Sequence, residues 1–129
     1  MNRKLLITGT VFGILAICLG AFAAHGLEKL IEEPSITSFE TGVRYQMYHA
    51  FLLLILGSTS FMSHKVKSRL LVLIILGVIL FSFSIYALAT NSLTAFDFKA
   101  IAIVTPVGGL ILIAAWILML ITILKTKID

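Results

Sequence analysis

The sequence predicts an all-α integral membrane protein, a four-helix bundle that forms a single transmembrane domain over residues 1–129. Charged residues make up 12% of the chain, whereas an ordinary soluble domain has roughly 25%. Hydrophobic residues make up 60%, which is more than a soluble fold of this length could bury. The charged residues that remain are concentrated between four long uncharged stretches, so the chain is divided into spans and short connections.

The four stretches without Asp, Glu, Lys or Arg cover residues 5–27, 45–64, 70–96 and 100–124. A hydrocarbon core about 30 Å thick is crossed by roughly 20 helical residues. A helix pairs its own backbone amides, and these would be costly to leave unpaired in lipid. We therefore expect transmembrane helices at about 5–25, 43–63, 70–91 and 100–124.

The basic residues indicate the orientation of these helices. Seven of them precede the first span, join the second to the third, or follow the fourth: Arg3, Lys4, Lys65, Lys67, Arg69, Lys125 and Lys127. The opposite loops hold Lys29, Arg44 and Lys99 together with five of the six acids, Glu28, Glu32, Glu33, Glu40 and Asp97. By the positive-inside rule both termini are predicted in the cytoplasm, in a multi-pass protein of the bacterial cytoplasmic (inner) membrane. The net charge of +4 fits contact with anionic membrane lipids, and we expect no nucleic-acid partner.

The first span carries small residues along one helical face, namely Gly9, Gly13, Ala16, Gly20 and Ala24. Small side chains let two helices approach closely in lipid. This helix-packing stripe suits either an intramolecular neighbour or a second protomer, so a homo-oligomer or a partner membrane protein stays open. The N-terminus also resembles a signal peptide, but its apolar run exceeds the usual length of about 7–15 residues, and we expect it to be retained.

The outer connection after the first span is predicted to be a short amphipathic helix. Gly26 is placed to end the first helix, and Leu27, Leu30 and Ile31 then alternate with charged residues. Pro34 breaks the chain. Thr37, with Glu40 three residues later, forms a capping-box pattern that predicts the start of the second helix.

The third and fourth spans each change character near the outer side. Residues 81–86 read Phe-Ser-Phe-Ser-Ile-Tyr, and the two serines are expected to bond back to their own helix. In the fourth span Pro106 removes one helical hydrogen bond, so a kink is expected in its outer half.

One layer of polar and small residues is the candidate functional site. Taking Val43 and Lys99 as markers of the outer interface, the helical rise puts His49 roughly 9 Å deep and Pro106 roughly 10 Å deep. An outer-leaflet pocket is predicted from the residues at this depth, with His25 just above them. The candidate residues are His25, Tyr45, Gln46, His49, Tyr86, Thr105, Pro106, Gly108 and Gly109.

Two interpretations of this layer compete. Polar groups in lipid must find partners, so they either form an interhelical hydrogen-bond network or hold a ligand. Trp116 and Tyr48 are expected to be packing or interfacial residues. No catalytic residues and no metal site are predicted, because the spans contain no paired carboxylates and Cys18 is the only cysteine.

Two longer motifs resemble a recognised family. They are Gly20-Ala21-Phe22-Ala23-Ala24-His25-Gly26-Leu27 and Phe39-Glu40-Thr41-Gly42-Val43-Arg44-Tyr45-Gln46-Met47-Tyr48-His49-Ala50. With residues 81–86 and 105–109, they make the chain similar to the domain of unknown function 423 family, the YgdD and YwdK type of small inner-membrane proteins. The resemblance implies a four-helix membrane fold and no established activity.

These observations favour a non-enzymatic membrane protein, without cofactor, whose polar pocket takes a lipid-like or small ligand or a partner helix. One alternative is an oligomeric channel or transporter for a small solute. No Asp or Glu lies within the spans, so coupling there would depend on histidine. A second alternative is a redox protein in which His25 and His49 bind haem or contact a quinone.

Overall fold

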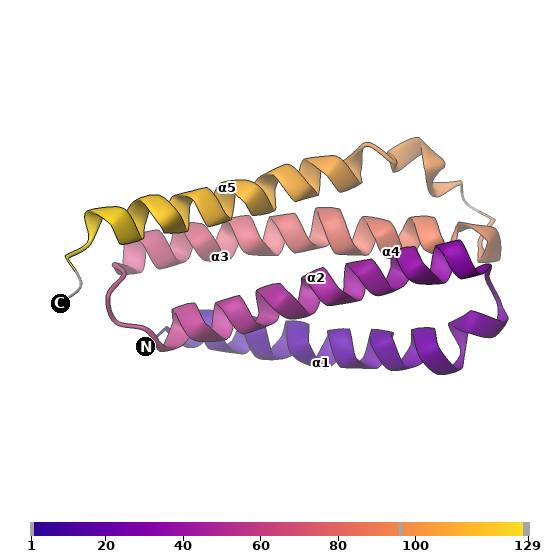
Figure 1. Ribbon diagram of the computed structural model, residues 1–129, viewed down its shortest axis with the longest axis horizontal. Coiled ribbons are helices and arrows are strands. Elements are labelled where there is room, and N and C mark those ends of the chain that lie inside the picture. The colour runs from indigo at the N-terminus through magenta and orange to yellow at the C-terminus, as the bar shows by residue number, and fades with distance from the viewer. Residues whose placement is uncertain (1, 96, 128–129) are drawn as a thin grey trace.

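The computed structural model describes residues 2–95 and 97–127, and within them it confirms the predicted all-α bundle (Figure 1). The long helices are α1 (Arg3–His25), α2 (Glu33–Ser58), α3 (His64–Val78) and α5 (Val104–Lys125). A π-helical turn, η2 (Ile79–Phe83), continues α3 into α4 (Ser84–Ala89). Three 3-10 turns, η1 (Leu27–Lys29), η3 (Asn91–Leu93) and η4 (Phe98–Ile101), lie at the opposite end of the bundle from the start of α1.

The helices form two antiparallel hairpins. α1 packs against α2, and α5 packs against α3 and η2. The hairpins join where α2 contacts α3, η2 and α4. In Figure 1 the helices therefore follow one another in the order α5, α3 with α4, α2 and α1, and α1 begins at the same end at which α5 finishes.

Three of the helical segments are long and apolar enough to cross a membrane: Arg3–Lys29, His64–Ala89 and Phe98–Lys125, with mean hydropathies of 2.3, 2.8 and 2.7. α2 is the fourth long helix and is more polar. Its Gln46 and His49 side chains are 0% and 4% exposed. These two polar side chains are therefore turned into the bundle, where they meet other helices.

The stripe of small residues on α1 faces α2. A Cβ atom added to Gly9 would lie 2.9 Å from the carbonyl oxygen of Ala50, and one added to Gly20 would lie 3.4 Å from Val43. Ala16 is buried, and Ala24 at the end of the stripe is exposed. The close approach that the stripe permits is thus used within the chain.

The predicted start of α2 is wrong. The helix begins at Glu33, and Pro34 lies in its first turn. A proline costs nothing there, because the first backbone N–H groups of a helix have no helical acceptor. Thr37 does not cap the helix, since its hydroxyl donates to the carbonyl oxygen of Glu33 at 3.1 Å.

The predicted kink at Pro106 is also wrong. The chain passes through η4 and a turn at residues 102–103 before α5 begins at Val104. Pro106 is therefore in the first turn of an α-helix, as Pro34 is. The break in the helix precedes the proline, and the rest of α5 continues without interruption to Lys125.

A buried lysine joins α3 to the end of α2. Lys67 is 3% exposed, and its ammonium group donates to the carbonyl oxygen of Thr59, the residue that caps α2. Unpaired carbonyl groups give the end of a helix partial negative charge, so a cation there is favourable. From the sequence alone, Lys67 is indistinguishable from the other basic residues of this connection.

Candidate functional site

The predicted polar layer separates into two groups of residues on different sides of α2. One group is a buried hydrogen-bond network between α2, α1 and the π-turn region. The other is an open groove between α2, η2 and α5.

Gln46 is at the centre of the buried network. Its side-chain amide donates to the carbonyl oxygen of Phe12 at 2.9 Å, and its Oε1 accepts from the hydroxyl of Tyr86 at 2.7 Å. Ser82 donates to the carbonyl oxygen of Gly42 at 2.7 Å. A Cβ atom on Gly42 would lie 2.7 Å from the Tyr86 ring. Only a glycine at position 42 therefore leaves room for the tyrosine ring to approach α2. These bonds connect α2 to both neighbouring helices.

Two serines in and just after the π-helical turn bond to different helices. A π-turn holds one extra residue, so the next helical segment is rotated relative to its position in a continuous α-helix. Ser82 bonds to α2, whereas the Ser84 hydroxyl lies 2.6 Å from that of Thr105 on α5. Ser84 also bonds back to the carbonyl oxygen of Leu80, as expected of a serine in a membrane helix. The predicted bond back to its own helix is thus seen for Ser84, while Ser82 has an interhelical partner.

His49 is held by two hydrogen bonds. Its Nδ1 lies 2.7 Å from the carbonyl oxygen of Tyr45, and its Nε2 accepts from the indole N–H of Trp116 at 3.1 Å. A carbonyl can only accept, so the ring proton is on Nδ1, and the lone pair of Nε2 is used by Trp116. Both ring nitrogens are therefore engaged.

A groove of about 300 Å³ opens beside His49. Its walls are formed by α2, η2 and α5 through Tyr45, His49, Phe81, Gly109, Leu112, Ile113 and Trp116. Tyr45 and Trp116 are 41% and 47% exposed, so the groove faces outward from the bundle. Rings of Tyr45 and Phe81 pack at 4.9 Å between centroids. Within residues 2–95 and 97–127, the Tyr45 hydroxyl makes no hydrogen bond to another residue.

Gly108 sets the distance between α5 and the π-turn. A Cβ atom at this position would lie 2.3 Å from the backbone nitrogen of Phe81. The adjacent Gly109 faces the groove, where an added Cβ would lie 3.6 Å from the Phe81 ring. Gly108 thus lets the backbones of α5 and the π-turn touch, and Gly109 forms part of the groove wall.

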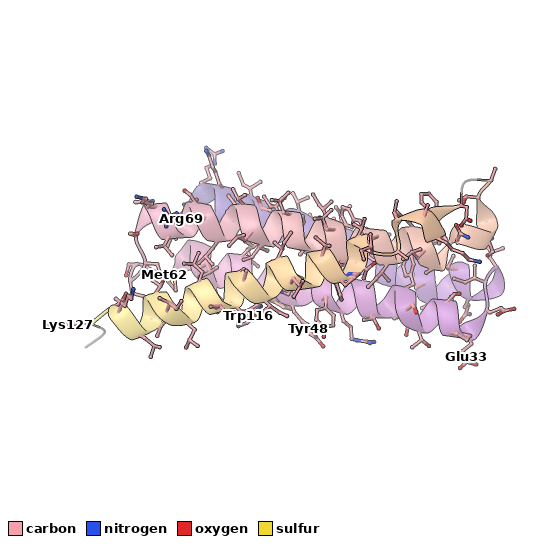
Figure 2. The ribbon with its side chains drawn as sticks, turned by 90° about the horizontal axis from the view of Figure 1, so that it is seen from above. Glu33, Tyr48, Met62, Arg69, Trp116 and Lys127 are labelled. Carbon is pink, nitrogen blue, oxygen red and sulfur yellow. The ribbon has the colours of Figure 1, made fainter. Side chains whose placement is uncertain are left out.

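The predicted layer that places His49 at the level of Pro106 is wrong. The ring contacts Trp116, which is ten residues beyond Pro106 on α5, a distance of about 15 Å along a helix. Figure 2 shows Trp116 and Tyr48 near the middle of the long axis. His49 and Pro106 therefore do not share one layer, as the depth argument had predicted. Thr105 lies instead at the level of Ser84.

The other candidate residues lie outside the groove. His25 is exposed at the end of α1, and Pro106 is exposed in the first turn of α5. Four residues of the groove were not among the predicted ones: Phe81, Leu112, Ile113 and Trp116. For Trp116 a signal existed, because an indole N–H deep in a lipid-embedded segment requires an acceptor.

The chemistry available here is limited to hydrogen bonding and apolar contact. Among the described residues, no group of three or more His, Cys, Asp or Glu side chains could hold a metal ion. Within residues 2–95 and 97–127, His49 is the one titratable imidazole in the groove wall, and no Lys, Arg, Asp or Glu lines it.

Comparison with known proteins agrees with this fold. Residues 19–109 match the family described as "Protein of unknown function (DUF423)". The chain belongs to this family. The UPF0382 inner membrane protein YgdD of Escherichia coli K12 is 36% identical over 129 residues, covering 98% of this chain and 93% of the relative. The UPF0382 membrane protein YwdK of Bacillus subtilis is 34% identical over 128 residues, covering 95% and 98%. A UPF0382 membrane protein of Haemophilus influenzae is 32% identical over 117 residues, covering 91% and 90%.

Membership of the DUF423 family confirms the resemblance seen in the two motifs, and no solved structure matches the chain. Together with the three apolar helices, the relatives identify an integral membrane protein of the bacterial inner membrane. The family is one of unknown function, so activity has to be argued from the groove.

Proposed function

We propose that this DUF423 protein is a non-enzymatic membrane protein that binds a lipid-like amphiphile in the groove beside His49. The observation that carries the proposal is the outward opening of this groove between two aromatic side chains, Tyr45 and Trp116. A volume of about 300 Å³ is at the lower end of small-molecule sites.

The polar part of the ligand is uncharged in this proposal. Of the residues that the structure describes, no lysine, arginine or carboxylate lines the groove, and both nitrogens of His49 already have partners. The Tyr45 hydroxyl is left to donate to, or accept from, a ligand atom. A hydroxyl, ester or carbonyl group satisfies that chemistry.

The apolar part of the ligand would follow α5. A second hollow of about 470 Å³ continues from the groove, with Ile113 and Trp116 common to both. Its other residues are Ile117, Met119, Leu120 and Ile123, so its lining is hydrocarbon and sulfur apart from the indole. From residue 113 to residue 123 the hollow runs about 15 Å along the helix. That length and lining suit one hydrocarbon chain.

The transport alternative gains no support from the polar residues. Gln46, Tyr86 and Ser82 are engaged with one another or with backbone carbonyls inside the bundle. The haem alternative needs a free histidine nitrogen to bind iron. Nε2 of His49 accepts from Trp116 instead, and His25 lies at an exposed helix end. A quinone carbonyl remains within the class of uncharged polar groups that Tyr45 would bind.

The test uses Trp116, which is the only tryptophan of the chain. The protein is placed in phosphatidylcholine vesicles, and fluorescence quenching by a bromine-labelled diacylglycerol is compared with quenching by bromine-labelled phosphatidylcholine. The diacylglycerol, with its free hydroxyl, is expected to quench more strongly at equal mole fraction. Equal quenching by both lipids contradicts the proposal, and protection of Trp116 from both indicates that a partner helix covers the groove.

Tyr45→Phe and Tyr48→Phe form a matched pair of variants. Tyr48 is exposed one turn further along α2 and does not line the groove. Loss of one hydrogen bond, about 1 kcal/mol, corresponds to about fivefold in affinity. Tyr45→Phe should therefore weaken the preference for diacylglycerol about fivefold, while Tyr48→Phe leaves it unchanged. The same result for both variants would refute the role of the Tyr45 hydroxyl.

A further inference from the structure

We propose a second lipid site, for an anionic phospholipid, in a groove between α3 and α5 at the basic end of the bundle. The groove has a volume of about 530 Å³ and is lined by Ser68, Arg69, Val72 and Leu73 of α3 and by Leu118 of α5. It shares no residue with the groove beside His49, so the two proposals stand independently.

The groove has polar side chains at its mouth and apolar side chains deeper in, which matches the polar headgroup and the hydrocarbon chain of a phospholipid. Ser68 and Arg69 are exposed near the start of α3 and provide polar groups at the mouth. Val72, which is 56% exposed, and Leu73 follow one turn deeper, with Leu118 on the opposite wall. An arginine can bind a phosphate through two parallel hydrogen bonds, and a serine hydroxyl can donate a third. The hydrocarbon chain would then cover the apolar walls.

Charge selects the type of phospholipid. At this end of the bundle the charged side chains of the described residues are all basic: Arg3, Lys4, Lys65, Lys67, Arg69, Lys125 and Lys127. The described acids, Glu28, Glu32, Glu33, Glu40 and Asp97, belong to the loops at the other end. Figure 2 shows this separation, with Arg69 and Lys127 at one end and Glu33 at the other.

This separation leaves the Arg69 guanidinium without a carboxylate neighbour at its own end of the described chain. The cationic headgroup of phosphatidylcholine or phosphatidylethanolamine would be repelled by the surrounding lysines, whereas a phosphodiester without a cation would not. Basic pockets between membrane helices bind anionic headgroups for this reason. The predicted ligand is therefore a lipid of the phosphatidylglycerol type.

The experiment is a lipid titration of the full-length protein in detergent, followed by native mass spectrometry. Dioleoyl-phosphatidylglycerol is expected to remain bound at about fivefold lower concentration than dioleoyl-phosphatidylcholine, which corresponds to about 1 kcal/mol for one favourable cation. Equal retention of the two lipids would overturn the proposal. Displacement of the phosphatidylglycerol by inorganic phosphate alone would also overturn it, because the site would then bind a free anion.

Two arginine variants separate the groove from general surface charge. Arg69→Gln removes the charge at the mouth, and Arg3→Gln removes one on α1, outside the groove. Both side chains are exposed, so neither change should unfold the protein. Arg69→Gln is expected to abolish the preference for phosphatidylglycerol, and Arg3→Gln to change it less than about twofold. Equal losses in both variants would show that diffuse charge, not this groove, attracts the lipid.

A third variant tests the chain-binding part of the groove. Val72→Trp places a large ring against the apolar wall while leaving Arg69 unchanged. Weaker retention of phosphatidylglycerol is expected, and full retention would show that the acyl chain does not occupy this wall. Helix content measured by circular dichroism confirms that each variant is folded.

Discussion

Alanine substitutions at Gly108 and Gly109 should have opposite effects on stability. An alanine Cβ at position 108 would lie 2.3 Å from the backbone nitrogen of Phe81 and 2.5 Å from the backbone carbon of Leu80. The first distance is about 1 Å short of the 3.4 Å at which ordinary contact begins. Because both neighbours are backbone atoms of the π-turn, no side-chain rotation relieves the clash, and α5 must move away from η2.

Two opposing contributions determine the change in the free energy of unfolding. Overpacking a well-packed contact costs about 1–3 kcal/mol, and replacing glycine by alanine within a helix gains about 1 kcal/mol. We place Gly108→Ala near the upper end of this cost, since a whole helix has to shift, and expect a net loss of about 2 kcal/mol. At position 109 the nearest atom would lie 3.6 Å away. Gly109→Ala should therefore be neutral or stabilising by up to about 1 kcal/mol.

The assay is reversible unfolding in mixed micelles of dodecyl maltoside and sodium dodecyl sulfate, followed by circular dichroism. The two variants add the same methyl group to neighbouring residues of one helix, so each serves as the control for the other. If Gly108→Ala proves as stable as Gly109→Ala, the close contact between α5 and the π-turn does not exist in solution.

Three further predictions concern the network, the buried lysine and the orientation. In a double-mutant cycle of Gln46→Leu and Tyr86→Phe, the coupling energy should be about 0.6–1.7 kcal/mol, as for other interhelical hydrogen bonds in membranes; a value near zero would show that the 2.7 Å bond adds no stability. Lys67→Met should lower the free energy of unfolding by about 1–2 kcal/mol through loss of the bond to the end of α2, while the exposed Lys65→Met should change it by less than about 0.5 kcal/mol; equal effects would contradict a capping role. In intact cells a membrane-impermeant maleimide should label Ser92→Cys and not Lys65→Cys, and the reverse pattern would disprove cytoplasmic termini.

Helix number and order could be predicted from the sequence because they depend on local composition. A stretch free of charge and long enough to cross a bilayer has few alternatives to a helix in lipid. The basic residues that the sequence assigned to one side do lie at one end of the bundle. The small-residue stripe of α1 packs against another helix, as predicted. The sequence left open whether that helix belonged to the same chain, and it is α2.

The helix starts were mispredicted at both prolines. Each proline was interpreted as a break, yet Pro34 and Pro106 occupy the first turn of α2 and α5. The same missing N–H disrupts a helix interior and is harmless at its start, so the residue alone does not distinguish these cases. The common level predicted for His49 and Pro106 was wrong for a separate reason, because it did not take into account which side chains meet across helices.

Partners across helices depend on relative register, which local sequence does not encode. Gln46 and Tyr86 are forty residues apart, and His49 and Trp116 are sixty-seven apart. The sequence identified the first pair as members of one polar layer, but it did not separate them from the groove. Nor did it predict the π-turn, since Ile-Leu-Phe-Ser-Phe is compatible with an α-helix. In the structure the turn lies against Gly42 and Gly108, contacts that the local sequence does not reveal.

The surplus residue in η2 makes this part of the chain sensitive to length rather than to side-chain identity. The wider turn absorbs its extra residue, so α4 faces about as it would after a continuous helix one residue shorter. If η2 tightened to α-helical geometry with all its residues present, everything up to Ala89 would turn through about 100°, and Tyr86 would no longer point at Gln46. One residue inserted between Phe83 and Tyr86 is thus expected to do more damage than most replacements, whereas a deletion inside η2 leaves the direction of Tyr86 nearly unchanged.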